Sequence, residues 1–244
     1  MTAIFIMGVG LLAILTLFPL GALSMARAVR EDRAAHIAAN AASWANAVDL
    51  RNDTNIANAL STAPSGGLPP NPDGPGYPVY VDPIYAPGGY AGVGAAGGLL
   101  GNLAGATPGM TRTSPSFLAG QPAIARYFLF QDEIQFETTG QPAQPSGGGI
   151  VNRPNTYSCA LLMRRPRSSS PALTELSVVV YANRGLDSLQ GETAFATAGA
   201  AGTNAVSITY PAGAKPTIRK GGWVLDTSYQ QSGGYGTVNG YFYQ

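Results

Sequence analysis

Residues 1–26 read MTAIFIMGVGLLAILTLFPLGALSMA, and none of them is charged. As a helix this stretch would reach about 39 Å at about 1.5 Å per residue, which is enough to cross a hydrocarbon core of about 30 Å. Its apolar residues occur on every side of that helix, so they do not form the one-sided stripe of a surface helix. The stretch therefore predicts a helix embedded in a membrane.

A cleaved signal peptide and a buried core helix both fit residues 1–26 less well. A secretory signal peptide has a basic start and a shorter apolar centre, although Ala22-Leu23-Ser24 has the form of a cleavage site. A buried helix of a soluble protein is usually shorter and better capped. Proline and glycine are tolerated in membrane helices, where small residues let neighbouring helices approach. We assign the membrane and assembly contacts of the predicted helix to Ile4, Phe5, Gly8, Gly10, Leu11, Leu12, Leu15, Phe18, Pro19 and Leu20.

Residues 27–60 differ in composition from the uncharged run before them. Three arginines and two acidic residues between Arg27 and Arg33 mark the end of the apolar layer. The alanine-rich stretch that follows favours helix, so we expect one helix from about residue 3 to about residue 50. Asp53 or Thr54 is placed to cap a short second helix through Leu60. Apolar residues at spacings of three and four predict a face that packs on the head, formed by Ile37, Ala41, Trp44 and Val48, with Ala34 above them.

Residues 61–122 are rich in Gly, Pro, Ala, Tyr and Asn, as in GGLPPNPDGPGYP. This composition predicts a loop or linker, because it offers little apolar area to regular elements. We expect its tyrosines to hold it against the head: Tyr77, Tyr80, Tyr85 and Tyr90.

Residues 123–244 carry a series of short strand signals separated by turns, which favours an antiparallel sheet. Residues 164–171 (RRPRSSSP) read as a hairpin connection between two of these strands. A sheet packed on the second half of the long helix gives an α+β fold, with Trp223 in the core and the aromatic C-terminus as the last strand. The expected strands are Arg126–Gln131, Ile134–Glu137, Tyr157–Met163, Thr174–Ala182, Ala205–Tyr210, Gly222–Thr227 and Thr237–Tyr243.

The residue types give little support to catalysis. His36 is the one histidine and Cys159 the one cysteine, so no triad or zinc site can be assembled from them. Asp132 and Glu133 are adjacent and would point to opposite faces of a strand. The glycine clusters lack a phosphate-loop context, and no calcium loop is present. We predict no enzyme activity, no cofactor, no metal and no small-molecule substrate.

The net charge of +1 gives no reason to expect nucleic-acid binding. A local basic cluster is formed in the sequence by Arg164, Arg165 and Arg167, with Arg219 and Lys220 as a second. The first cluster is either a solvated hairpin tip or a contact patch for acidic neighbours, DNA or an anionic surface polymer. We expect Cys159, in the apolar stretch YSCALLM, to be a small buried residue.

The segment AIFIMGVGLLAILTLFPLGAL resembles the N-terminal helix of type IV pilins and type II secretion pseudopilins, in particular of their minor subunits. The resemblance covers about the first fifty residues, with Gly8 and Pro19 near positions where the family has a helix glycine and a kinking proline. The family's basic leader, its glycine before the cleavage point and its glutamate are missing from these residues. We expect a start upstream, a truncated chain or a degenerate member. Counting positive charges alone would place the Arg27 side in the cytoplasm, whereas the resemblance places it outside.

The resemblance implies a minor pilin or pseudopilin with a pilin-like fold. The expected location is a bacterial inner membrane, crossed once, with the head in the periplasm or on a surface filament. The expected partners are membrane lipid, sister subunits and the assembly machinery. The alternative is a membrane-anchored extracytoplasmic binding protein that joins no filament; a secreted enzyme with an unfamiliar site is a third hypothesis.

Overall fold

The computed structural model describes most of the N-terminal half of the chain and the C-terminal strands. The expected strands at 126–131 and 134–137, together with Asp132, Glu133, Tyr85 and Tyr90, lie outside the described residues. The described residues are 2–64, 66–82, 99–100, 109–118, 157–182, 195–199, 206–210, 213, 215–216, 218 and 220–244, and the side chains of residues 2–20 are described at Met7, Gly8, Leu15 and from Phe18 onward.

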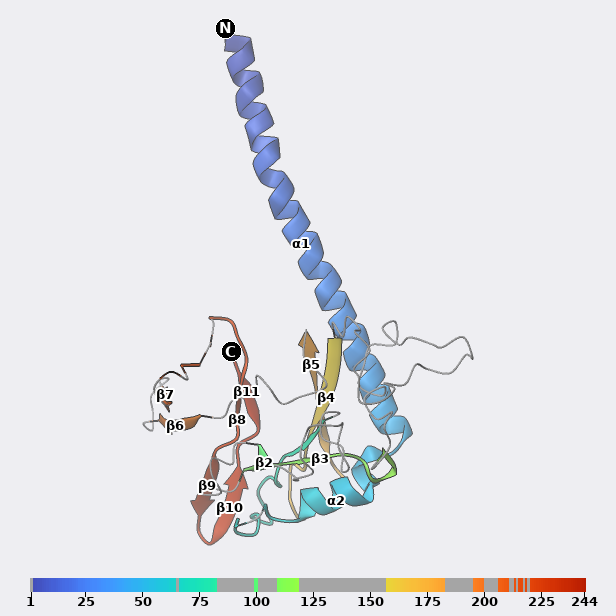
Figure 1. Ribbon diagram of the computed structural model, residues 1–244. Helices are drawn as coiled ribbons and strands as arrows, with labels where there is room; N and C mark the ends of the chain where they lie inside the picture. The colour runs from blue at the N-terminus through green and yellow to red at the C-terminus, as the bar shows by residue number, and fades with distance from the viewer. Residues whose placement is uncertain are drawn as a thin grey trace, which may run out of the picture.

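Helix α1 spans Thr2–Ala47, is 46 residues long and runs through Pro19 without interruption. Its second half lies on the head, while its first half extends away from the head on its own (Figure 1). The helix ends before Asp49, whose φ of 49° places it in the left-handed region. A left-handed residue at this point breaks the helical hydrogen-bond ladder. The long helix predicted from residue 3 to about 50 is therefore present, within three residues at its C-terminal end.

A short helical corner follows α1 at the base of the head. It comprises the 3₁₀ helix η1 (Leu50–Asn52) and helix α2 (Thr54–Ser61). Asp53 is the N-cap of α2, because its Oδ1 accepts hydrogen bonds from the backbone N–H of Asn55 at 3.0 Å and of Ile56 at 3.3 Å. Its Oδ2 accepts from the backbone N–H of Ser116 at 2.8 Å, which ties in the 3₁₀ helix η2 (Ser116–Leu118). The predicted cap is confirmed as Asp53.

Replacing Asp53 by alanine is expected to lower the free energy of unfolding of the head by about 1–2 kcal/mol. The variant loses the cap of α2 and the link to Ser116 together. Equilibrium urea unfolding followed by tryptophan fluorescence measures the change, since Trp44 packs against the head's core. Asn58→Ala, on the exposed side of α2, is the control and should change stability little. Equal stabilities of the two variants would contradict the capping role.

The main sheet has five strands in the order β2-β3-β1-β4-β5. Strands β4 and β5 form an eight-residue antiparallel hairpin in which Arg164 lies opposite Glu175, so the predicted hairpin connection is confirmed. Strand β1 lies between β3 and β4 and pairs in parallel with β3 and antiparallel with β4. The strands are β1 (Val79–Val81), β2 (Leu99–Leu100), β3 (Met110–Thr113), β4 (Tyr157–Arg164) and β5 (Glu175–Ala182).

Two predictions about this sheet were wrong. Strands β1 to β3 come from residues 61–122, which the composition had placed in a loop, and one pair of the sheet is parallel. The three residues of β1 are too few to give a periodic signal, but both neighbouring strands pair with them and all three are buried. The long connection from β1 to β3 provides the crossover that a parallel pair needs. The chain is α+β with a mixed, mostly antiparallel sheet.

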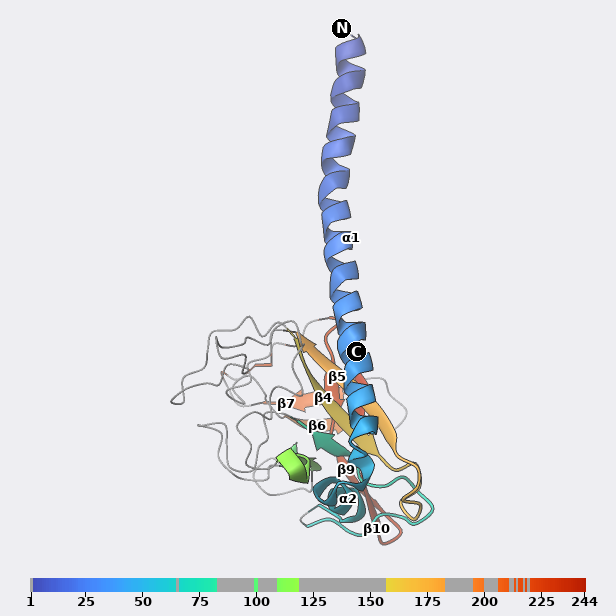
Figure 2. The same cartoon turned by 90° about the vertical axis from the view of Figure 1, so that its right-hand side faces the viewer.

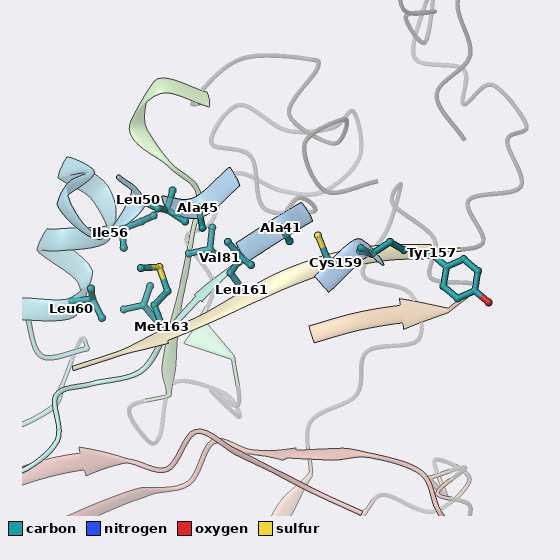
Figure 3. Packing of buried hydrophobic residues seen from close by; sticks show 12 residues of the cluster. Ala41, Ala45, Leu50, Ile56, Leu60, Val81, Tyr157, Cys159, Leu161 and Met163 are labelled. Carbon is teal, nitrogen blue, oxygen red and sulfur yellow. The ribbon is translucent and has the colours of Figure 1, made fainter. Parts of the chain in front are cut away.

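One face of the sheet packs on α1 and α2. Alternate residues of β1 and β4 point toward the helices and form a core with their apolar side chains (Figure 3). Leu161 and Val81, which are register partners, are fully buried at its centre. The predicted packing of the helix on a sheet is confirmed. The buried residues of this core are Ile37, Ala41, Ala45, Leu50, Ile56, Leu60, Val79, Val81, Tyr157, Cys159, Leu161 and Met163.

The other face of the sheet is covered by C-terminal strands, on the side away from α1 (Figures 1 and 2). Its core includes Tyr77, Tyr80, Leu162 and Val238, so two of the four predicted tyrosine contacts are confirmed. The covering strands are β8 (Val224–Asp226), β9 (Tyr229–Ser232), β10 (Tyr235–Val238) and β11 (Tyr241–Tyr243), and β6 (Ala196–Gly199) pairs with β7 (Val206–Thr209) elsewhere in the head.

The C-terminal strands are held by hydrogen bonds to the segment before β1. The Tyr77 hydroxyl donates to the Leu68 carbonyl at 2.6 Å, and the Leu68 N–H donates to the Tyr229 hydroxyl at 2.8 Å. The Gly236 N–H donates to the Pro69 carbonyl at 3.0 Å. A Cβ on Gly236 would overlap the hydroxyl groups of Tyr77 and Tyr229. Glycine at this position therefore allows the hairpin to approach closely.

The C-terminal predictions need two further corrections. The expected strand Thr237–Tyr243 is divided at Asn239 and Gly240 into β10 and β11, and β11 pairs with β8 in a separate two-stranded sheet. Trp223 is 66% exposed rather than part of the core, because it precedes β8 at the rim of that small sheet.

Candidate functional site

The part of α1 that extends away from the head, here called its free half, carries large apolar side chains that are exposed to solvent. Phe18 is 79% exposed and Met7 is 73% exposed. At a turn of about 100° per residue, Phe18 and Leu20 point to nearly opposite sides of the helix, so the exposed apolar side chains are not confined to one side. The exposed large apolar residues of α1 are Met7, Leu15, Phe18, Leu20, Leu23, Met25 and Val29.

The remaining predicted residues of this helix are placed as follows. Gly8 and Pro19 are exposed, and a Cβ added at Gly8 or Gly21 would meet nothing within 4 Å. The side chains of Ile4, Phe5, Gly10, Leu11 and Leu12 lie outside the described residues. Where the structure describes the side chains of its helices, no stretch combines the length and the apolarity needed to cross a membrane.

Charged residues follow the apolar run along α1. Arg27, Arg30 and Arg33 are exposed, as are the two acidic residues between them. His36 lies 3.7 Å from Asp32 through its Nε2, with both side chains largely exposed. The single histidine is therefore exposed to solvent.

The junction between α1 and the head is apolar and tightly packed. Ile37 and Ala41 are buried, and Trp44 and Val48 are half-buried against the same core. The Trp44 ring also lies against Phe117, with 6.3 Å between ring centroids. Ala45, four residues after Ala41, is buried as well; it was not predicted, because alanine gives a weak apolar signal.

The three arginines of the predicted basic patch have different surroundings. Arg164 lies over the Tyr241 ring at 4.7 Å from its centroid and donates to the Tyr241 hydroxyl at 2.5 Å. Arg165 is buried and donates to the Ser61 hydroxyl at 2.9 Å. Arg167 is exposed, with its guanidinium 4.0 Å from the Asp73 carboxylate. The three residues therefore do not form one contact patch, because alternation along the chain sends neighbouring side chains to different sides.

The sheet contains a buried ion pair that was not predicted. The Arg112 Nη2 donates to Asp82 Oδ2 at 2.7 Å, and both side chains are almost completely buried. The Arg112 guanidinium also lies 5.9 Å from the centre of the Tyr80 ring, whose hydroxyl contacts that of Tyr181. The signals in the sequence were slight: an aspartate directly after VYV and an arginine within MTRT. The parallel pairing of β1 and β3 brings them together.

Cys159 is buried on the helix-facing side of β4, as the sequence predicted. Burial raises the pKa of its thiol from 9.0 to about 12, and the nearby Asp82 charge adds to that increase. A thiol in this state is protonated near neutral pH and is a poor nucleophile or metal ligand. Among the described residues, no group of three or more His, Cys, Asp or Glu side chains is placed to hold a metal ion.

The raised pKa of Cys159 predicts a pH dependence of stability. The unfolded thiol loses its proton above pH 9, whereas the folded thiol keeps it until about pH 12, so rising pH in this window favours the unfolded chain. The free energy of unfolding should fall by up to about 1.4 kcal/mol per pH unit from this group. Urea unfolding of the wild type and of Cys159→Ala at pH 8 to 11 measures it. Parallel pH profiles for the two proteins would contradict the prediction.

Comparison with known proteins gives no family for the chain: no family model, curated protein or solved structure matches it. The arrangement offers a helix whose first half extends away from a folded head and carries exposed apolar side chains.

Proposed function

We propose that the chain is a structural subunit, of the minor pilin or pseudopilin kind, that assembles into a filament of a type IV pilus or type II secretion-like system through its N-terminal helix. In this proposal residues 1–26 lie in the bacterial inner membrane before assembly and contact sister helices afterwards. The head is then displayed in the periplasm or on the filament surface. The chain acts by assembly and carries out no catalysis.

The observation that supports this proposal is the free half of α1. Exposed apolar side chains lie on opposite sides of it, and residues 1–26 contain no charged residue. Apolar area of this extent is costly in water, since each fully exposed large side chain forgoes about 1.5–3 kcal/mol of burial free energy. Lipid tails or the helices of sister subunits would cover it on all sides.

The junction gives the proposal a second support. Ile37, Ala41 and Ala45 are buried between α1 and the sheet, and the helix continues from this contact into the free half without a break. A continuous helix fixed in this way couples the position of the head to that of the rod. Such coupling suits a subunit whose head must take a defined place along a filament.

Cross-linking between copies tests the proposal. Phe18→Cys in a Cys159→Ala background places a thiol on the free half of α1, and Ser169→Cys places one on the exposed hairpin connection of the head. In cells that naturally produce the chain, oxidation should yield disulfide-linked copies of the Phe18→Cys variant. The chain should also be found in sheared surface filaments or in purified secretion filaments. Its absence from both, with no cross-link at residue 18, would contradict filament assembly.

The alternative function, a membrane-anchored binding protein outside any filament, is favoured by one feature of the head. Tyr241 and Tyr243 are about half exposed on one side of β11, while Phe242 between them packs on the core. Trp223 is exposed beside the paired strand β8. Aromatic side chains in such positions are frequent in binding surfaces. An isolated monomer in detergent that still binds a ligand, and loses it in Tyr241→Ala/Tyr243→Ala, would favour this function.

A further inference from the structure

The arginines at the junction of α1 share the side of the helix that faces the head. Arg30 precedes Ile37 by seven residues, which is two helical turns, and Arg33 precedes Ile37 by one turn. Arg27 stands two turns before Ala34, which is half-buried above the head. Glu31 and Asp32 are rotated away from this side, by about 100° and about 200° from Arg30. Arg30 therefore lies above the head with Arg27 and Arg33 about 60° to either side of it, Glu31 lies about 40° beyond Arg27, and Asp32 lies on the opposite, acidic side.

These arginines are available for a partner. All three are exposed, and among the described residues none forms an ion pair, although Glu31 lies four residues after Arg27. Asp32 is near His36 instead, at 3.7 Å. By contrast, two exposed arginines of the head do have a described acidic partner: Arg51 pairs with Asp49, and Arg167 with Asp73.

The position of these arginines along α1 matches the headgroup layer on one side of a membrane. Arg27 is the first charged residue after the uncharged run, and the three arginines extend over about 9 Å of helix. The headgroup region on one side of a bilayer is roughly 5–8 Å thick. If residues 1–26 occupy the hydrocarbon core, the arginines stand among the headgroups, between the membrane and the head (Figure 1).

We propose that Arg27, Arg30 and Arg33 bind the phosphate groups of anionic membrane lipids. The guanidinium group is planar and donates two parallel hydrogen bonds to phosphate oxygens, so it suits this ligand better than a point charge does. Because the arginines lie on the head side, bound lipid collects over the head and fixes the rotation of α1 about its axis. This inference rests on the membrane anchor of the proposed function.

Lipid retention in nanodiscs tests the inference with the full chain. The wild type is placed in nanodiscs of phosphatidylcholine and phosphatidylglycerol in equal amounts, and native mass spectrometry counts the lipids that stay bound. Each arginine near an anionic surface contributes roughly fivefold to binding. We expect phosphatidylglycerol to be retained at least about tenfold over phosphatidylcholine, and this preference to weaken in high salt.

Two triple variants with the same change in net charge are compared, and the second is the control. Arg27→Gln/Arg30→Gln/Arg33→Gln should retain the two lipids almost equally. Arg51→Gln/Arg167→Gln/Lys220→Gln, which alters exposed cations of the head, should keep the wild-type preference. Tryptophan fluorescence should show the same folded head in all three proteins.

The outcomes separate this inference from the proposed function. A wild type that enters the nanodiscs but retains both lipids equally overturns lipid binding and leaves the anchor intact. A wild type that does not enter them overturns both. A third outcome combines two results: the wild type shows no lipid preference, and the first triple variant loses cross-linking between copies in pure phosphatidylcholine. In that case the arginines contact the acidic side of a second copy, and lipid binding is overturned.

Discussion

Replacing Asp82 by alanine is expected to lower the free energy of unfolding of the head by about 3–5 kcal/mol. The aspartate is fully buried and its Oδ2 lies 2.7 Å from Arg112, which is itself 6% exposed. Without the carboxylate, a guanidinium charge stays in the interior between β1 and β3 with its main counter-charge removed. Urea unfolding followed by tryptophan fluorescence measures the loss.

Two further variants separate the buried charge from a general effect of the substitution. Asp73→Ala removes the carboxylate of an exposed ion pair with Arg167, and we expect a far smaller change because water screens that pair. Asp82→Ala/Arg112→Met removes both buried charges and should recover part of the stability that Asp82→Ala loses. Equal effects of Asp82→Ala and Asp73→Ala would show that the buried pair has no special role in the head.

Replacing Leu15 by aspartate is expected to reduce membrane association of the full chain about a hundredfold. Leu15 is 61% exposed on the free half of α1, near the middle of the uncharged run. An aspartate near the centre of a membrane helix costs about 2.5–3.5 kcal/mol. Carbonate-washed membranes and sheared filaments, assayed by immunoblot, measure the shift into the soluble fraction.

Ser43→Asp is the matched control for this substitution. It places the same charge on an exposed position of the same helix, where α1 lies along the head. We expect Ser43→Asp to leave the amount of chain in the membrane fraction unchanged. Neither variant should alter urea unfolding of the head, because residues 15 and 43 are both outside the core of the head. If Leu15→Asp stays in the membrane fraction like the wild type, the free half of α1 is not the anchor.

The helical half of the molecule was largely readable from the sequence. Residues 2–47 carry long, unbroken signals for helix, and Asp53 stands at the position where a side-chain cap is needed. The apolar spacing of Ile37, Ala41, Trp44 and Val48 coincides with the contact to the sheet. These features depend on residues that are close in sequence, so local chemistry determines them.

The arrangement of the sheet was less predictable. Strand β1 contains only Val79–Val81 and lies in a Gly- and Pro-rich region, so its strand state depends on β3 and β4 on either side. The Asp82–Arg112 pair depends on the same arrangement, since only the parallel register of β1 and β3 brings the two residues together. The basic cluster Arg164, Arg165 and Arg167 was overestimated, because proximity in sequence does not give a shared surface on a strand and its turn.

The central position of β1 also constrains how the polypeptide reaches its native state. Val81 must pair with Thr113 of β3 on one side and with Leu161 of β4 on the other. Both partners are synthesised long after Val81. Helices α1 and α2 form from local contacts on a timescale of microseconds, whereas pairings between distant residues carry the loop-closure entropy that slows folding. During translation the N-terminal helix is therefore complete before β4 exists. The head closes only once Tyr157–Arg164 has emerged from the ribosome.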